Sequence, residues 1–241
     1  YNTENGDDVW SAEVKGQVRG LAIADGTLIV STTAGKIYAY SDAASTPKNV
    51  AASSYPAKTN AQPYAKDDLS ATYEATAKDI LKQTGVKRGF CLVVGGGQGR
   101  LAFELARRSD LQIYCAVPDA NKVAAARRAL DGAGLYGHRI TVVHCPLDAI
   151  PFSDYFANLV VSDTLVASGD LPVDVAEVAR HVKPLGGKLC LGEPAHAARP
   201  IAEKTQKRIR TEAADVYSPD AAEVKQADRW TLVTRGKLPG A

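Results

Sequence analysis

The sequence predicts an α/β protein whose main part is a doubly wound, mostly parallel sheet, preceded by a small antiparallel β-meander. From Gly89 onward, short continuous apolar runs alternate with segments of helical periodicity. Strands that are buried on both faces and alternate with covering helices produce this pattern. Within residues 1–45, β-branched runs are instead separated by glycine-marked turns, which is typical of antiparallel hairpins.

Composition and charge exclude several classes of protein. Apolar residues make up 45% of the 241 residues, which is a globular composition. The 29 basic and 27 acidic side chains give a net charge of +2, so the charge excess of a nucleic-acid or membrane-surface binder is missing. No apolar run approaches the roughly 18 residues of a spanning helix. We therefore expect neither nucleic acid nor a membrane as a partner.

The cysteines indicate the cellular compartment. Cys91, Cys115, Cys145 and Cys190 each fall inside an apolar run, and no two form a C-x-x-C pair. They are predicted to be small buried side chains in a reducing environment, so a cytoplasmic location is expected. Neither the cysteines nor the histidines have the spacing of metal ligands, and no metal site is predicted.

The first strands are predicted from turn chemistry. Asp25-Gly26 separates two β-branched runs, and Ala34-Gly35 separates the second run from a third. Residues 1–45 should thus form a meander of about three short strands. Residues 46–66 are rich in Ala, Ser, Thr, Pro and Lys without periodicity, which predicts a linker.

The α/β domain is predicted to span residues 67–241. Its first helix should begin at Asp67–Asp68, whose carboxylates suit a helix N-terminus, and end at Gly85. The elements predicted after it are strand 90–94, helix 99–109, strand 111–117, helix 119–133, strands 140–145 and 158–161, helix 173–182, strand 188–191, helix 201–214 and strand 230–234.

A glycine-rich turn between the first core strand and its helix is the strongest functional signal. Gly95, Gly96, Gly97 and Gly99 allow a sharp turn and a close approach of the backbone to a ligand. A dinucleotide-binding fingerprint would have its third glycine where Arg100 stands, which disfavours a nicotinamide-dependent oxidoreductase. The alternative is a tight turn with no ligand.

The turn and four later motifs together resemble the class I S-adenosylmethionine-dependent methyltransferases over residues 68–235. The later motifs are Asp119–Arg127, Leu147–Phe152, Val182–Leu189 and Trp230–Gly236, the last as a terminal antiparallel strand. The resemblance implies a Rossmann-like sheet, S-adenosylmethionine as cofactor and S-adenosylhomocysteine as product. The methyl acceptor would be a small molecule or a protein.

Three acidic positions of that family are altered. Val93 stands two residues before the first motif glycine, where the family usually has an acid. Val117 occupies the place of the acid that binds the ribose, with Asp119 two residues later as a displaced ribose ligand or as a helix N-cap. The acid that commonly contacts adenine maps near Pro146 or Leu147, one or two residues before Asp148. The resemblance implies the following cofactor-binding residues: Gly95, Gly96, Gly97, Gly99, Val117, Asp119, Leu147, Asp148 and Ser162.

Two carboxylates are candidates for a catalytic base. Asp163 follows the fourth core strand, where the family often places residues that contact the acceptor, and a loop cap is its alternative role. Glu193 follows the fifth, with an exposed turn carboxylate as the alternative. Tyr64 and Tyr73 either close over the cofactor or pack in the core. The Asn/Asp-Pro-Pro-aromatic signature of amino methylation is absent, so nucleobase methylation is disfavoured.

Residues 8–42 resemble one blade of a quinoprotein-like β-propeller. The resemblance rests on Trp10, Asp25-Gly26, Gly35-Lys36 and Tyr38-Ala39. A single blade cannot close a propeller. Because the chain starts at Tyr1 and has no methionine, further blades are expected in a longer parent chain. The leading hypothesis is a methyltransferase of unassigned acceptor. The alternative is a catalytically degenerate methyltransferase-fold module that serves binding or scaffolding in a propeller-containing protein.

Overall fold

A computed structural model of the chain describes residues 2–41, 60–195, 197 and 199–237. The chain divides into two compact units, Tyr1–Pro56 and Ala57–Ala241. Most of the predicted linker, residues 46–59, lies outside the described residues. No helix in the described part of the chain combines the length and the apolar character that a membrane crossing needs.

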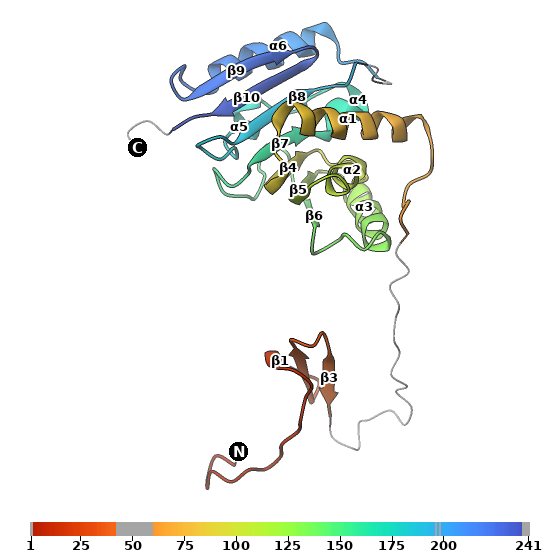
Figure 1. Ribbon diagram of the computed structural model, residues 1–241, viewed down its shortest axis with the longest axis vertical. Coiled ribbons are helices and arrows are strands. Elements are labelled where there is room, and N and C mark those ends of the chain that lie inside the picture. The colour runs from red at the N-terminus through yellow and green to blue at the C-terminus, as the bar shows by residue number, and fades with distance from the viewer. Residues whose placement is uncertain (1, 42–59, 196, 198, 238–241) are drawn as a thin grey trace. The chain divides into compact units, whose positions relative to one another are not determined.

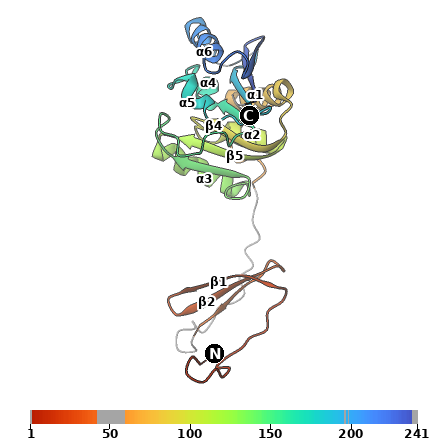
Figure 2. The ribbon, with the colours of Figure 1, turned by 90° about the vertical axis from the view of Figure 1, so that its left-hand side faces the viewer.

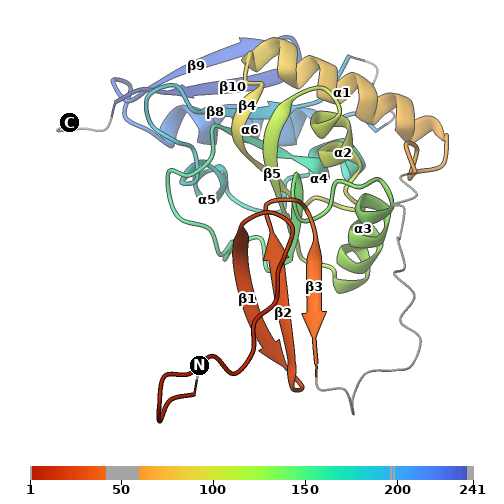
Figure 3. The same ribbon diagram turned by 60° about the horizontal axis from the view of Figure 1, so that its bottom comes forward.

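The first unit is the predicted antiparallel meander. Its strands β1 (Val18–Ala24), β2 (Thr27–Thr32) and β3 (Ile37–Tyr40) pair in that order (Figure 3). Asp25 and Gly26 both have positive φ, 46° and 71°, as a two-residue hairpin turn requires. The turn chemistry that the sequence shows therefore forms the hairpin.

The meander has almost no core of its own. Every residue of β1 is exposed, and the side chains of Leu21 and Ile23 are 66% and 79% exposed. Val30 is the one hydrophobic residue of the described strands β1–β3 that is buried. Sheets of this size usually need a packed apolar face for stability.

The second unit is built on a seven-stranded sheet of order β6-β5-β4-β7-β8-β10-β9 (Figure 1). The parallel pairs run from β6 to β8, and β10 is antiparallel to both β8 and β9. This confirms the predicted fold class and the antiparallel last strand. The strands are β4 (Arg88–Val94), β5 (Asp110–Val117), β6 (Ile140–His144), β7 (Leu159–Ser162), β8 (Lys188–Gly192), β9 (Ala222–Ala227) and β10 (Trp230–Arg235).

Helices cover both faces of this sheet. Alternate residues of β4 enter two apolar layers, Cys91 and Val93 on one face and Leu92 and Val94 on the other. Helices α1, α2 and α3 supply the first layer, and α5 and α6 the second; Figure 2 shows α1 and α2 on the opposite side of β4 from α4 and α5. The helices are α1 (Asp68–Thr84), α2 (Arg100–Ala106), α3 (Ala120–Gly132), α4 (Asp163–Ser168), α5 (Val175–Ala179) and α6 (Glu203–Asp215).

Local sequence accounts for the ends of α1. The Asp67 side chain accepts a hydrogen bond from the Ser70 backbone N–H, and the Ser70 hydroxyl accepts one from the Asp67 N–H, which forms a capping box. Gly85 ends the helix in the left-handed conformation, φ 68°. Both ends lie within a residue of the prediction.

Two elements are absent from the sequence prediction. Helix α4 has six residues between Ser162 and Gly169, too few to show a helical period. Strand β9 has mostly exposed residues such as Glu223 and Lys225, because it lies at the edge of the sheet beyond β10. The predicted helix 173–182 is shorter in the structure, where α5 covers only Val175–Ala179.

Candidate functional site

The predicted cofactor-binding residues gather at the carboxyl ends of the parallel strands. The turn Gly95–Gly99, called the glycine turn below, follows β4, Val117 ends β5, and Leu147 and Asp148 follow β6. Ser162 ends β7. Strands β5 and β7 flank β4 on opposite sides, so the strand order reverses at the glycine turn. Open α/β sheets bind ligands in the crevice at such a reversal.

The backbone of the glycine turn is fixed against β5. The Gly95 and Gly96 N–H groups both donate to the Ala116 carbonyl, at 2.8 and 3.2 Å. A Cβ at Gly96 would stand 2.8 Å from the Cys115 Cβ. The φ angles of Gly95, Gly97 and Gly99 are 72°, 46° and 83°, a conformation that favours glycine. Glycine is therefore required here by both conformation and space.

The other side of the glycine turn faces the start of α4. A Cβ at Gly95 would overlap the Thr164 Cγ2 atom, and one at Gly97 would stand 2.6 Å from Asp163 Oδ2. The turn and the carboxylate thus lie in direct contact, although 66 residues separate Gly97 from Asp163 in the sequence.

Asp163 is a buried carboxylate without a hydrogen bond of regular geometry among the described residues, and the Tyr73 hydroxyl lies close to it. Its exposed fraction is 0%. Burial raises the pKa of Asp163 to about 7, and the Tyr73 hydroxyl, Lys122 and Arg100 offset part of this rise. Perturbed carboxylates next to a ligand-binding turn are typical of functional sites.

Two tyrosines pack beside the turn and Asp163. The Tyr64 hydroxyl donates to the Gln98 carbonyl at 2.8 Å, and its ring meets the Phe103 ring edge-on with centroids 5.5 Å apart. Tyr73 is buried on α1 beside Asp163. Burial raises the pKa of both tyrosines, so both stay neutral hydroxyl donors.

Arg100 holds the segment before α1 against the glycine turn. Its guanidinium pairs with both oxygens of Asp67, at 2.7 and 2.9 Å, and lies 5.2 Å from the centroid of the Tyr64 ring. In the sequence, Arg100 stands out only as the residue that breaks a dinucleotide fingerprint. Its partners lie more than 30 residues away, and no local pattern could have identified them.

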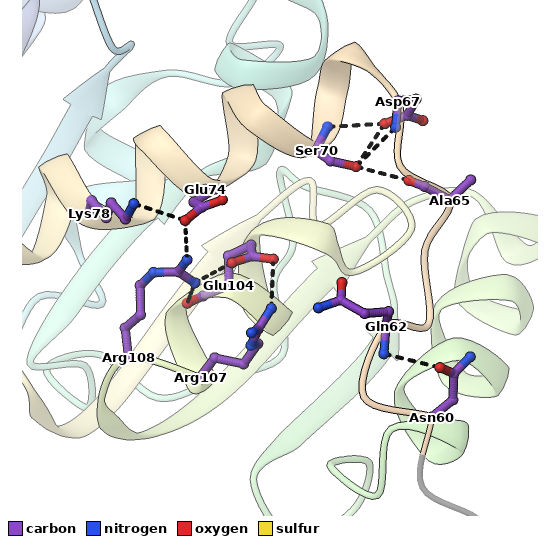
Figure 4. Close-up of polar contacts among 10 residues, drawn as sticks. All are labelled: Asn60, Gln62, Ala65, Asp67, Ser70, Glu74, Lys78, Glu104, Arg107 and Arg108. Carbon is purple, nitrogen blue, oxygen red and sulfur yellow. Dashed lines mark hydrogen bonds and ion pairs between the residues drawn. The ribbon is translucent and has the colours of Figure 1, made fainter.

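A cavity of about 370 Å³ lies beside these tyrosines, between the start of α1 and α2. Tyr64 and Tyr73 line it. Figure 4 shows the charged side chains around it engaged with one another: Arg108 pairs with Glu104 and, at 2.9 Å, with Glu74. Tyr64 therefore borders both this cavity and the glycine turn.

The remaining cofactor candidates differ in exposure. Asp119 is exposed, and its carboxylate accepts from the backbone N–H groups of Asn121 and Lys122, at 2.8 and 3.1 Å, as the N-cap of α3. Asp148 is exposed, whereas Val117 and Leu147 are buried. Ser162 caps α4 and its hydroxyl lies 2.8 Å from that of Thr164. The apolar positions thus lie inside and the acids at the rim.

Glu193 lies in a different environment from the one expected for an exposed turn. Its side chain is fully buried, with one oxygen ion-paired to Arg229 and the other accepting from the Ile201 N–H at 2.7 Å. Both oxygens are engaged. The carboxylate joins the end of β8 to the turn between β9 and β10 and to the segment before α6.

The four cysteines are buried free thiols, as predicted. Within the described ranges, no group of three or more His, Cys, Asp or Glu side chains is arranged to hold a metal ion.

Comparison with known proteins places these features in a wider context. Residues 91–186 match the family model described as a methyltransferase domain. No curated protein matches the chain.

Three solved structures share the fold. A proposed S-adenosyl-L-methionine-dependent methyltransferase from Methanococcus maripaludis is 23% identical, with a TM-score of 0.53, covering 72% of this chain and 90% of its own. A SAM-dependent methyltransferase from Aquifex aeolicus is 18% identical, with a TM-score of 0.51, covering 67% and 90%. The magnesium protoporphyrin IX methyltransferase from Synechocystis PCC 6803 is 16% identical, with a TM-score of 0.50, covering 69% and 79%.

Proposed function

We propose that the unit Ala57–Ala241 is an S-adenosylmethionine-dependent methyltransferase whose acceptor is a small molecule or a protein. The observation that carries this proposal is the glycine turn at the strand-order reversal, within the segment that matches the methyltransferase domain. A glycine turn alone would be compatible with other ligands, and the domain match is what favours this cofactor.

The residues at the sheet edge fit this cofactor. Four of the five residues of the glycine turn are glycines, so its backbone is open to a ligand. The buried carboxylate of Asp163 beside it makes no hydrogen bond of regular geometry with any described residue. Val117 and Leu147 offer apolar contacts to an adenine ring, and the exposed Asp119 and Asp148 can accept hydrogen bonds from ribose hydroxyls or the adenine amino group. The bound cofactor supplies a methyl group activated by its sulfonium.

The protein's own contribution would be to bind, orient and exclude water. Tyr64 and Tyr73 supply an aromatic layer beside the glycine turn. Of the two base candidates, Asp163 lies at the turn with unengaged oxygens, whereas both oxygens of Glu193 are engaged. We keep Asp163 as the carboxylate of the site and assign Glu193 a structural role.

Calorimetric titration with S-adenosylmethionine and S-adenosylhomocysteine tests the proposal. The intact chain should bind with a Kd of about micromolar order. Gly97→Ala should lose binding, because its Cβ would approach Asp163 to 2.6 Å. The matched control is Gly137→Ala, at a glycine of similarly positive φ, 85°, with nothing within 4 Å of its Cβ. Equal binding by both variants would remove the glycine turn from the site.

The alternative is a methyltransferase-fold module without activity, used for binding or as a scaffold. The specific observation in its favour is that Val93 and Val117 are both fully buried where the related family has acids. The valine side chains cannot hydrogen-bond the cofactor as carboxylates would. Failure of the intact chain to bind either ligand would favour this alternative.

We also retain the proposal that the N-terminal meander is one blade of a propeller completed by further blades of a parent chain. Its exposed Leu21 and Ile23 support a packing partner for this small sheet. Limited proteolysis of the chain should therefore cleave within the meander before the α/β unit. A meander that resists cleavage as well as the α/β unit does would contradict the need for neighbouring blades.

A further inference from the structure

We propose that Asp163 binds a cationic group of the cofactor directly and gives up its proton when that group arrives. The inference rests on the proposed function and deepens it, because it assigns Asp163 as a binding carboxylate that couples cofactor affinity to pH. The O–H bond of the Asp163 carboxylic acid breaks, the proton passes to solvent, and the carboxylate pairs with the cation.

The position of the carboxylate is the first support. A Cβ atom added to Gly97 would lie 2.6 Å from Asp163 Oδ2. The carboxylate therefore packs directly against the backbone of the turn that a ligand would approach. Asp163 is also the first residue of α4, and Ser162, not Asp163, caps that helix. The predicted loop-capping role for Asp163 is thus filled by its neighbour.

The missing partners are the second support. A charged carboxylate that has neither solvent nor a hydrogen bond is strongly unfavourable. A buried carboxylate of this kind is therefore protonated unless a ligand supplies a partner for its charge. Asp163 has an exposed fraction of 0%, and neither of its oxygens makes a hydrogen bond of regular geometry among the described residues. The Tyr73 hydroxyl is the one uncharged donor near enough to lower the pKa of Asp163, and it supplies no positive charge. Nearby Arg100 is already engaged by Asp67.

The groups that face Asp163 come from five segments. They are Tyr64 before α1, Tyr73 on α1, Arg100 on α2, Cys115 on β5 and Lys122 on α3. Burial raises the pKa of the Cys115 thiol, so it stays neutral, as do both tyrosines. The two cations offset only part of the effect of burial, which leaves the pKa of Asp163 at about 7.

The direction of the pH dependence follows from these values. Without ligand, Asp163 is mostly protonated below pH 7, and a cation at the carboxylate lowers its pKa. Binding therefore releases a proton below pH 7, and affinity falls as the pH falls. We expect the Kd to rise about 10- to 30-fold from pH 7.5 to pH 5.5, since each pH unit below the pKa of the free state changes affinity up to about tenfold.

Two cationic groups of the cofactor are possible partners, the α-ammonium and the sulfonium. Three probes separate them. S-adenosylmethionine has both groups, S-adenosylhomocysteine has only the ammonium, and 5′-methylthioadenosine has neither. Titrations stay at or below pH 7.5, because an α-amino group loses its own proton near pH 8.

The experiment is calorimetric titration at pH 6.5 in phosphate and in imidazole, whose ionisation enthalpies differ. With S-adenosylmethionine the wild-type chain should release about three quarters of a proton per site. Release with S-adenosylhomocysteine as well identifies the ammonium, and release with S-adenosylmethionine alone identifies the sulfonium. The same release with 5′-methylthioadenosine would overturn the inference.

Variants make the assignment specific. Asp163→Asn should abolish proton release, flatten the pH dependence and weaken binding at pH 7.5 by at least about tenfold. Asp131→Asn, an exposed carboxylate of α3, is the matched control and should behave like the wild type. If Asp163→Asn does not fold, Tyr73→Phe serves instead: it removes a hydroxyl that lowers the pKa of Asp163, and the affinity midpoint should move to higher pH.

Different results would contradict the role of Asp163 and the proposed methyltransferase function. Binding of S-adenosylmethionine without proton release, or proton release that persists in Asp163→Asn, overturns the role of Asp163 and leaves the methyltransferase proposal intact. Absence of binding of all three probes by the wild-type chain overturns the proposed function, and with it the role of Asp163.

Discussion

Arg100 and Asp67 join the first residue of α2 to the N-cap of α1 through two hydrogen-bonded contacts, Nη1–Oδ1 at 2.7 Å and Nη2–Oδ2 at 2.9 Å. Asp67 also accepts the Ser70 N–H, so one carboxylate both caps a helix and fixes a second helix. Since α2 follows the glycine turn directly, this pair connects the segment before α1 to the candidate site.

The Arg100–Asp67 pair should make the folding stability of the protein depend on pH in the acid range. The hydrogen bond from Arg100 lowers the pKa of Asp67 from 3.8 to about 2. A lowered carboxyl pKa stabilises the fold above the unfolded value, and this contribution is lost as the pH falls through the folded value. The stability difference between wild type and Asp67→Asn should thus be constant above about pH 5 and shrink progressively as the pH falls from about 5 to below about 2.

Urea titrations at several pH values measure this difference. Asparagine also caps helices well, so the substitution keeps the cap and removes the ion pair. A difference that stayed constant down to pH 2 would show that the ion pair does not stabilise the fold.

The contact between Gly95 and Thr164 should produce strong coupling. Gly95→Ala places a methyl group where Thr164 Cγ2 lies, in a left-handed conformation, and should destabilise the protein by about 2–3 kcal/mol. Thr164→Ser removes Cγ2 and should recover about 1 kcal/mol of that loss. A double-mutant cycle by chemical denaturation measures the coupling, and strictly additive effects would contradict the contact.

Glu193 should matter for stability more than for chemistry. Glu193→Ala leaves Arg229 without its buried partner and the Ile201 N–H without an acceptor, and we expect a loss of about 2–4 kcal/mol. The control Glu223→Ala breaks an exposed pair with Lys225 and should cost under about 0.5 kcal/mol. A stably folded Glu193→Ala that binds S-adenosylmethionine and has lost methyl transfer would instead support the catalytic role predicted from the sequence.

The Tyr64 hydroxyl should contribute a single hydrogen bond. Tyr64→Phe keeps the ring against Phe103 and removes the bond to the Gln98 carbonyl, so the free energy of unfolding should fall by about 1 kcal/mol. Thermal denaturation monitored by circular dichroism measures the change. Tyr136→Phe, on a half-buried tyrosine whose ring lies near Arg127, is the control and should change stability less. Equal losses would contradict a specific role for the Tyr64 hydroxyl.

Features coded within a few residues were predictable. The Asp25-Gly26 hairpin, the cap of α1 at Asp67 and the alternation of buried strands with helices follow from local backbone preferences and periodicity. The glycine turn was also found this way, because its φ angles demand glycine whatever lies around it. Strand β9 was missed, since a polar edge strand lacks the apolar signal of a buried one.

The sequence by itself determined the order of the elements other than α4 and β9, the antiparallel last strand and the place of the candidate site at the sheet edge. Only the tertiary structure decided that Asp163 is fully buried against Gly97, that Glu193 is held by Arg229, and that Arg100 binds Asp67. Burial and pairing depend on which distant segments meet when the sheet forms. A carboxylate becomes a structural anchor or a functional group through those neighbours, because they set its solvation and its hydrogen-bond partners.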